Sequence, residues 1–380
     1  MTESSTEASA PTLCARDLGG FVLHELVGAG AFGDVYLAEQ IALHREAIVK
    51  VLRPDDLDPS RVQRFLREAQ LASRLDHPYA AHIYDFGAED DGVLWIAMER
   101  VRGTSLRAIL DSQGPMPLER FVPFFERICE VVETAHEQGI VHRDLKPDNV
   151  MVIARAGRLL PKLLDFGIAR AIGGEAPLPL VDRPVDEAAS STTTQRGVVL
   201  GSPSYMAPEV WVNPHTAGPP ADQYALAALA YEALTGRLAF AGATVMDVAR
   251  AHSRGALAPL GDGLPIELDQ VLRRALSRAH GDRYDNVLEL AQALRAASGL
   301  AGGTVEMPQL DNQLRLRFLS RAPQPIAEAI AAFDAARNAH QAREAMRGIA
   351  RICAWYVGIL ALACRTRVGS GTAKIGRAHV

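Results

Sequence analysis

The run His142–Asn149, which reads HRDLKPDN, constrains this chain more than any other stretch. It brings a carboxylate, two cations and an amide together within a single short segment. Asp144 can accept the proton of an attacking hydroxyl, and Lys146 can neutralise charge on a moving phosphoryl group. Asn149 offers an oxygen to a divalent cation. Each group that phosphoryl transfer requires is therefore present.

Apolar residues flank this run and predict short buried strands at residues 140–141 and 150–153. The polar run should then be a loop held between two anchored segments, where catalytic groups are commonly found. The run resembles the catalytic loop of the protein kinases. Lys146 followed by Pro147 favours the serine/threonine branch of that family over the tyrosine branch. The alternative is a solvated polar turn, which would not need all these groups together.

Three glycines, Gly28, Gly30 and Gly33, have the spacing GxGxxG. Dinucleotide-binding folds share this spacing, but there a helix follows, whereas here an apolar strand continues from Val35. Glycines in a hairpin let backbone amides approach phosphate oxygens, because no Cβ intervenes. The resemblance to kinases implies that Val35 lies under the adenine of ATP. It also implies that the loop covers the phosphates, with the residues Gly28, Ala29, Gly30, Ala31, Phe32 and Gly33.

Lys50 lies in the apolar strand AIVKVL, where a charged side chain needs a partner or a ligand. A nucleotide phosphate would serve, and the alternative is a lysine at a strand edge that faces water. Apolar residues then recur at helical spacing up to Pro78, and Glu68 falls within this helix. The resemblance implies that Glu68 forms an ion pair with Lys50, which reports the active state. A surface glutamate beside several arginines is the alternative.

The resemblance assigns two further sets of residues. Asp165, in LLDFGIAR, is expected to hold Mg²⁺ together with Asn149, since two oxygen ligands from separate loops suit a cation that keeps waters and takes the rest from nucleotide. Residues 99–103 resemble the hinge between the kinase lobes. There the backbone of Glu99 and Val101 would bind adenine, and Met98 would guard the back of the pocket.

Residues between Gly167 and Met206 lack periodicity and resemble an extended activation loop. Arg143 needs an anion, and phosphate on a threonine of the run Ser190–Thr194 could provide one. The candidate phosphosites are Thr192, Thr193 and Thr194, and a plain Ser/Thr-rich linker is the alternative. The segment Gly201–Glu209 resembles the part of kinases that docks a protein substrate.

Two more positions complete the resemblance, which covers about residues 21–297 and is closest to the bacterial serine/threonine protein kinases. Asp222 opens an apolar helix and matches an aspartate that braces the catalytic loop, and Arg283 matches an arginine that pairs with Glu209. The implied fold is α+β and two-lobed. A small β-rich lobe with one main helix (21–98) and a hinge (99–103) precede a larger helical lobe (104–297).

The rest of the chain is expected to lie outside this domain. Residues 1–20 have the composition of a disordered tail, 298–312 that of a linker, and 313–368 predict the first helices of a truncated domain. Residues 369–380 predict a second disordered tail. Its last part, 374–380 (KIGRAHV), resembles translated read-through of a sequencing adapter, so the native chain is expected to continue.

An unbroken apolar run at 352–364 covers only about 20 Å of helix, less than the roughly 30 Å core of a bilayer. The preferred interpretation is therefore a buried helix, and the alternative is a membrane anchor. The acidic, polar start of the chain does not resemble a signal peptide, and the sparse cysteines suit a reducing compartment. We therefore expect the kinase-like domain in the cytoplasm.

The net charge of −5 leaves no bulk basic surface for a nucleic-acid backbone, so no nucleic-acid partner is expected. The expected cofactors are ATP and Mg²⁺. The expected partners are proteins with reactive Ser or Thr residues, together with a second copy in a dimer that phosphorylates itself in trans. Two rivals are a switch that only binds nucleotide and a small-molecule kinase. Intact Lys50, Asp144 and Asp165 argue against the first, and Gly201–Glu209 argues against the second.

Overall fold

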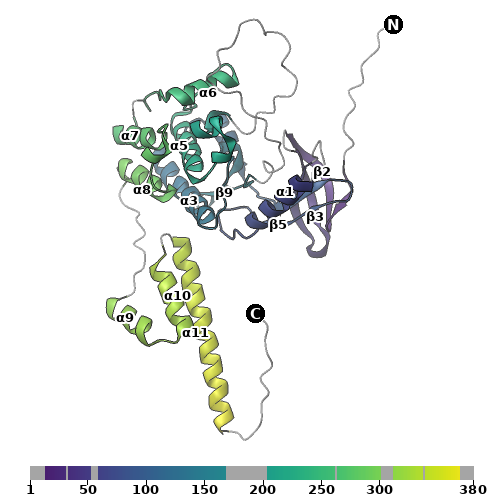
Figure 1. The fold of residues 1–380 in the computed structure, drawn as a ribbon, viewed down its shortest axis with the longest axis vertical. Helices are drawn as coiled ribbons and strands as arrows, with labels where there is room; N and C mark the ends of the chain where they lie inside the picture. Colours follow the sequence, from purple (N-terminus) through teal and green to yellow (C-terminus); the bar gives the residue numbers. More distant parts are fainter. Residues whose placement is uncertain are drawn as a thin grey trace. The chain divides into compact units, whose positions relative to one another are not determined.

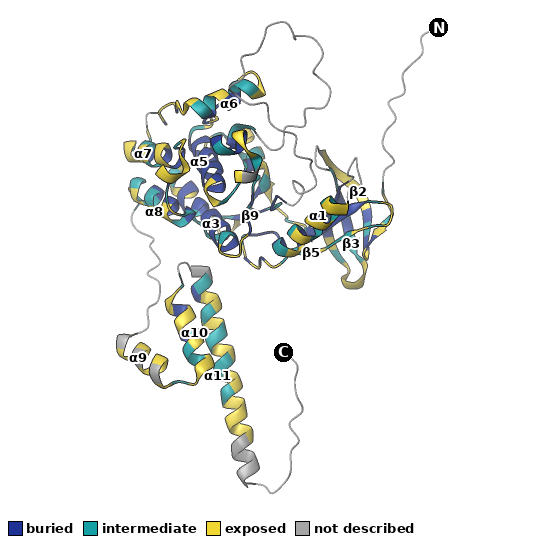
Figure 2. Ribbon diagram, viewed as in Figure 1, coloured by how far each residue is buried: buried dark blue, intermediate teal, exposed yellow. Residues whose placement is uncertain are grey.

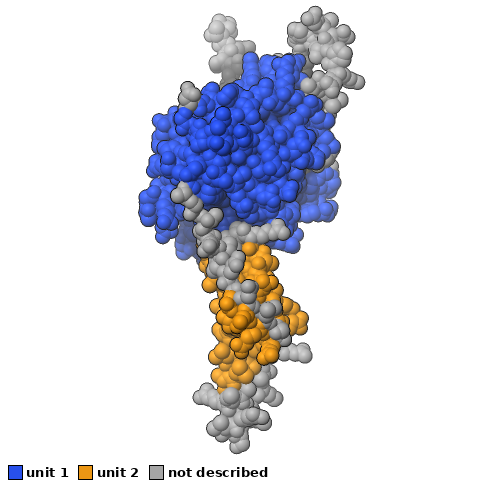
Figure 3. Space-filling view, turned by 90° about the vertical axis from the view of Figure 1, so that its left-hand side faces the viewer, with its two compact units in different colours: residues 1–301 blue, residues 302–380 orange. Residues whose placement is uncertain are grey.

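The structure is a computed structural model that describes residues 13–30, 33–52, 59–167, 203–261, 263–300, 311–336 and 339–368. The predicted phosphosites Thr192, Thr193 and Thr194 and the loop residues Ala31 and Phe32 lie outside these ranges. The chain divides into two compact units, residues 1–301 and 302–380 (Figure 3).

The first unit begins with an antiparallel sheet in the order β1-β2-β3-β4-β6-β5 (Figure 1). Side chains alternate along β4, so Ala47, Val49 and Val51 join a core on one face of the sheet. The other face packs against the main core of the unit, to which α1 contributes Phe65 and Ala69. The bounds are β1 Asp17–Leu18, β2 Phe21–Gly30, β3 Gly33–Gln40, β4 Arg45–Leu52, α1 Pro59–Ala72, β5 Ile83–Ala88 and β6 Leu94–Glu99.

The larger lobe is built around two helices, α3 and α5, which Figure 2 shows as largely buried. Nearly all residues of α5 are buried, as expected for a helix enclosed by others. The bounds are β7 Thr104–Ser105, α2 Leu106–Gln113, α3 Leu118–Glu137, β8 Val150–Arg155, β9 Arg158–Leu163, α4 Pro208–Val212, α5 Pro219–Thr235, α6 Val245–Arg254, α7 Ile266–Ala275 and α8 Val287–Ala297. The predicted two-lobed α+β fold is thus present.

The catalytic-loop run lies between α3 and β8, and β8 pairs with β7 and β9 in a small sheet. The strand predicted at 150–153 is confirmed. The strand predicted at 140–141 is wrong: Ile140 is buried but lies in the turn that closes α3, three residues after its end at Glu137, and its N–H donates to the carbonyl of Ala135. The loop is therefore anchored on one side by a helix and on the other by a strand.

The expectation of disorder throughout 1–20 is also wrong for its last residues. Asp17 and Leu18 form β1, which pairs with β2, and Leu18 is fully buried. Arg16 makes two hydrogen bonds to the Asp91 carboxylate, at 2.7 and 3.0 Å. The physical reason is local: Leu18 shares a core with Phe21 and Trp95, and burying its side chain offsets the entropy of ordering this short segment.

The second unit contains α9 Asn312–Arg321, α10 Gln324–Asp334 and α11 Ala339–Val368. Helices α10 and α11 pack together, burying Ile330, Phe333 and Ala342. The interpretation of 352–364 as a buried helix is wrong for its described part, since Trp355, Val357 and Leu360 are each more than 60% exposed. The helix length expected from the sequence was taken from the unbroken apolar run alone, whereas α11 extends beyond that run at both ends. Residues Gln341–Leu362 are long and apolar enough to cross a membrane.

Candidate active site

The predicted catalytic loop, residues 142–149, is anchored by the carboxylate of Asp222 on α5. Its oxygens accept the backbone N–H groups of His142 (2.7 Å) and Arg143 (2.8 Å). The ring nitrogen Nε2 of His136 lies 2.8 Å from the same carboxylate. Burial alone would raise the pKa of Asp222, but the hydrogen bond from His136 and the nearby histidines outweigh it, so the pKa lies below its ordinary value. A charged, fully bonded carboxylate thus fixes the loop backbone.

His142 is almost completely buried and connects the loop to the segment that carries Asp165. Its ring Nε2 contacts the carbonyl of Leu164 at 2.8 Å, and the ring packs on Phe166 with centroids 4.8 Å apart. Burial lowers the pKa of the imidazole, so the ring is neutral near pH 7. His142 therefore acts as a structural link between the two loops.

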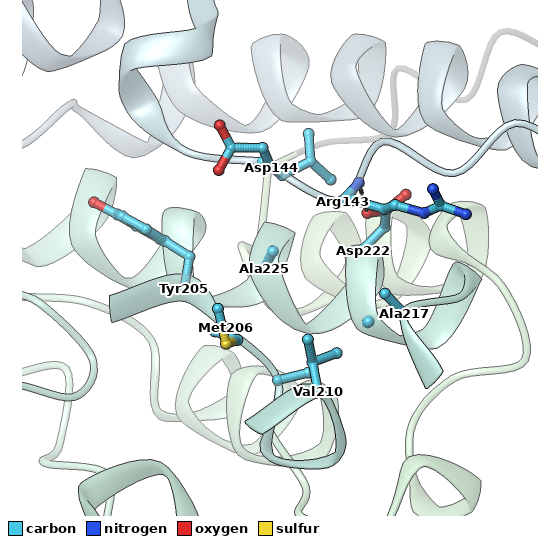
Figure 4. A pocket seen from close by; sticks show the side chains of 11 residues that line it. Arg143, Asp144, Tyr205, Met206, Val210, Ala217, Asp222 and Ala225 are labelled. Atoms are coloured by element: carbon cyan, nitrogen blue, oxygen red, sulfur yellow. Dashed lines mark hydrogen bonds between the residues drawn. The ribbon is translucent and has the colours of Figure 1, made fainter. Parts of the chain in front are cut away.

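Asp144 is oriented by two neighbours in its own loop. The Nδ2 of Asn149 donates to the Asp144 carbonyl (2.8 Å) and to its carboxylate (2.9 Å). Lys146 Nζ lies 2.9 Å from the same carboxylate. The side chain of Asp144 is 15% exposed, so it remains accessible from one side. A small cavity of about 30 Å³ lies beneath, between Arg143, Asp222, Met206 and Val210 (Figure 4).

The backbone is strained at the two loops that carry the chemistry. Arg143 and Asp165 have φ values of 62° and 49°, in the left-handed region that non-glycine residues rarely adopt. Gly167 follows at φ 36°, and a Cβ there would lie 2.6 Å from the His142 carbonyl oxygen. Strain of this kind persists only where the surroundings enforce it, and it clusters at functional sites.

Lys50 does not form the predicted ion pair with Glu68. Its Nζ lies 3.1 Å from the carboxylate of Asp165, while Glu68 accepts two hydrogen bonds of 3.2 Å from Arg143. The prediction of a Lys50–Glu68 pair is therefore wrong for this structure. The physical reason is competition between opposite charges. Lys50 pairs with Asp165 and Glu68 pairs with Arg143, so each of these four side chains has an oppositely charged partner.

The described residues that are predicted to bind nucleotide lie on β2, β3, β4 and β6 and just after β6. Gly28 faces Val35, and Gly30 faces Gly33, across the hairpin of β2 and β3. Val35 also lies opposite Lys50 on β4, so both point to the same side of the sheet. Gly33 is at φ 125°, and a Cβ there would meet the Val51 carbonyl oxygen at 2.1 Å. Only glycine fits this position.

The end of β6 and the residues that follow it carry the other predicted adenine contacts. Met98 is buried in the main core. The Glu99 N–H donates to the His82 carbonyl at 2.8 Å. The Glu99 carboxylate lies 2.8 Å from Lys162 Nζ, a contact that the sequence did not reveal. Val101 is half-buried two residues further on.

Asn149 and Asp165 are suited to a magnesium ion by their donor atoms. The amide nitrogen of Asn149 is engaged with Asp144, which leaves its oxygen for a metal. Asp165 supplies a carboxylate that already attracts a cation, the ammonium of Lys50. One carboxylate and one amide oxygen are typical for Mg²⁺, which completes its shell with water and phosphate. The two residues present therefore fit this ion.

Two networks outside the loops brace the larger lobe, and each has at least one buried member. Arg283 makes a bidentate pair with the Glu209 carboxylate, at 2.7 and 2.8 Å, as the resemblance implied. Arg107 on α2 donates to the Tyr205 hydroxyl (2.7 Å) and to Glu232 on α5 (2.8 Å). Sequence reasoning missed this second network and His136. Only the placement of a histidine shortly before the catalytic loop could have suggested the latter.

Comparison with known proteins gives consistent matches. A family model described as the protein kinase domain matches residues 21–292. The serine/threonine-protein kinase PknB of Mycobacterium leprae is 36% identical over 287 residues, which cover 73% of this chain and 43% of that protein. The serine/threonine-protein kinase PrkC of Bacillus subtilis is 33% identical over 286 residues, covering 74% and 41%. The crystal structure of the Mycobacterium tuberculosis PknI kinase domain is 28% identical with a TM-score of 0.55, covering 77% of this chain and 100% of that chain. The chain thus spans less than half the length of these two curated relatives.

Proposed function

The chain belongs to the bacterial serine/threonine protein kinases, which use ATP and Mg²⁺, and we propose that it transfers the γ-phosphoryl group of ATP to Ser and Thr hydroxyls of other proteins in a signalling pathway. The observation that carries this proposal is the fixed carboxylate of Asp144 between Asn149 and Lys146. A carboxylate held in one place can orient an incoming hydroxyl and accept its proton.

The other predicted site residues support the reaction by charge and position. Lys146 lies beside Asp144, where it would offset the charge that develops on the transferring group. Lys50 would bind phosphate oxygens of ATP once it leaves Asp165, and the glycine hairpin would cover them. Bound Mg²⁺ supplies charge neutralisation on the phosphates, and Asn149 and Asp165 would hold it. The proton of the substrate hydroxyl passes to Asp144.

The test of this function is the intact mass of the full chain after incubation with MgATP and a mixed peptide substrate. Stepwise gains of phosphate on the peptides are expected, and fragment masses would locate gains on the chain itself. Binding of MgATP without phosphate on any peptide or on the chain would contradict the proposal and favour a switch that only binds nucleotide.

We also propose that phosphorylation at Thr192, Thr193 or Thr194, by a second copy within a dimer, activates the enzyme. Arg143 is the group that would bind such a phosphate, and Glu68 now occupies it. A phosphate carries more charge than a carboxylate, so it would displace Glu68. The freed Glu68 could then pair with Lys50, the arrangement that kinases use when active.

Substituting Arg143→Gln is expected to remove this dependence on phosphate. The parent, pre-incubated with MgATP, should phosphorylate a peptide about tenfold or more faster than the phosphatase-treated parent, because a charge-assisted contact of this kind contributes about 1.5–3 kcal/mol. The Arg143→Gln variant should show the same rate in both states. The measurement is the initial rate in each state, and Arg120→Gln, at an exposed site on α3, is the control. An equal phosphate-dependent gain in Arg143→Gln would contradict the exchange.

We propose in addition that α11 attaches the chain to the cytoplasmic face of a membrane, with the kinase domain in the cytoplasm. Within Gln341–Leu362, all of which the structure describes, Ala342 is the one buried residue, and 22 residues of helix extend about 33 Å, close to the bilayer core. Its charges lie in its first half, where three arginines (Arg343, Arg347 and Arg351) outnumber one glutamate. Arginines gathered at the start of such a helix favour the cytoplasmic side for that end.

The double substitution Val357→Lys with Leu360→Lys is therefore expected to move the chain from the membrane pellet to the supernatant. Each lysine costs roughly 2.5–3.5 kcal/mol inside a bilayer, whereas both positions are exposed to water in the structure. The measurement is the distribution after ultracentrifugation of cell lysate. The control is Ile266→Lys, an exposed apolar site in the larger lobe. An unchanged pellet fraction in the double variant would exclude membrane attachment through this helix.

A further inference from the structure

A second cavity lies in the larger lobe, away from the nucleotide-binding residues. It has a volume of about 210 Å³ and is lined by the end of α3, the start of α5 and the segment that leads into α8. Three carboxylates contribute to its walls: Glu133, Glu137 and Asp285. Apolar wall is supplied by Pro219, Pro220, Tyr284 and Val287. The combination of apolar walls with a few acidic groups is typical of a ligand site.

Glu133 is the unusual residue of this cavity. Its relative exposure is 7%, and its Oε2 has no hydrogen-bond partner in the described part of the chain. A buried carboxylate oxygen without a donor costs free energy that the fold must offset elsewhere. Each oxygen can accept hydrogen bonds, so a ligand with cationic N–H groups would satisfy it. The cavity therefore favours a positively charged ligand.

The arrangement favours an organic cation over a metal ion. Among the described residues no group of three acidic, histidine or cysteine side chains is placed to hold a metal. Carboxylates that do not converge on one point suit an extended ligand with several N–H groups.

The cavity has a direct connection to the catalytic loop. His136 lines it, and the same ring contacts Asp222 at 2.8 Å. Asp222 in turn accepts the backbone N–H groups of His142 and Arg143. A cation bound beside Glu133 would therefore lie one side chain away from the group that fixes the loop. We propose that this cavity is a binding site for a small organic cation that carries a guanidinium or primary ammonium group.

The test uses agmatine, an alkylamine with a guanidinium group, as the probe and isothermal titration of the full chain at constant ionic strength. We expect saturable binding to the parent. Glu133→Gln keeps the shape of the side chain and removes its charge, so it should weaken agmatine at least about tenfold. Asp285→Asn, at an exposed position, should weaken it about threefold. Glu119→Gln, exposed on the same helix α3 but outside the cavity, should leave affinity unchanged.

Neutral N-butylurea, which has a similar shape, should not bind. Equal affinity of agmatine for the parent and for both Glu133→Gln and Asp285→Asn would overturn the proposal, as would equal binding of N-butylurea or no binding of agmatine at all. Because titration reads binding directly, the result does not depend on the proposed kinase activity. A failure here would leave that activity untouched, and a chain without kinase activity could still bind agmatine.

Discussion

Replacing Asp144 with asparagine is expected to lower the rate of phosphoryl transfer by about a hundredfold to ten-thousandfold, the range that general base catalysis contributes. Asparagine has the same shape, so the contacts with Asn149 and Lys146 would keep its side chain in place. It cannot accept the proton of the substrate hydroxyl. The loss should therefore appear in kcat, while the dissociation constant for MgATP changes little.

The measurement is the initial rate of phosphate incorporation into a fixed peptide, together with an ATP titration of both proteins. Asp90→Asn provides a matched control, because Asp90 is an exposed aspartate in the turn before β6. It should keep the parent rate. If Asp144→Asn retained more than a tenth of the parent rate, Asp144 would not be the base. A variant that also lost ATP binding would point to a role in the shape of the site.

The catalytic loop could be predicted because its chemistry lies within one short run. Asp144, Lys146 and Asn149 are so close in sequence that almost any fold would bring them together, and the structure links all three. The glycine hairpin could be predicted for a similar reason, since the apolar residues after Gly33 predict a strand and not a helix. Both predictions depend on local spacing alone.

The partner of Glu68 could not be predicted in the same way. Sequence pattern places Glu68 on a helix, but the choice between Lys50 and Arg143 depends on how that helix packs on the sheet. Two arrangements of the same charges differ by only a few contacts, and the sequence is compatible with both. The network of Arg107, Tyr205 and Glu232 was missed because its members are far apart in the chain and meet only through tertiary packing.

The strand β1 and the surroundings of helix α11 also depend on tertiary packing and could not be predicted from sequence pattern. Leu18 anchors a two-residue strand, which is too short to produce an alternating pattern, and only its burial beside Trp95 reveals it. In the second unit, the composition of α11 indicates a helix correctly. Whether Trp355 and Leu360 face protein, lipid or water depends on what surrounds the helix, and composition cannot express that.

Substituting Arg283→Leu is expected to reduce the free energy of unfolding by about 3–5 kcal/mol, the usual cost of removing one partner from a buried ion pair. The Arg283 side chain is fully buried, so solvent screens the pair little. Its guanidinium also donates to the carbonyls of Pro220, Ser277 and Arg278. Leucine would leave these groups and the Glu209 carboxylate without their donor.

Urea unfolding followed by circular dichroism measures this loss. The control is Arg250→Leu, which removes an exposed arginine paired with Asp247 on α6, and it should change the free energy by less than about 1 kcal/mol. The contrast follows from burial, because both arginines form one ion pair but only Arg283 is shielded from water. A loss for Arg283→Leu no larger than that of Arg250→Leu would mean that packing around Glu209 relaxes to admit solvent. The segment with Tyr205 and Met206, which precedes Glu209, would then be held by the Arg107 network and by the hydrogen bond from Trp211 Nε1 to the Met206 carbonyl.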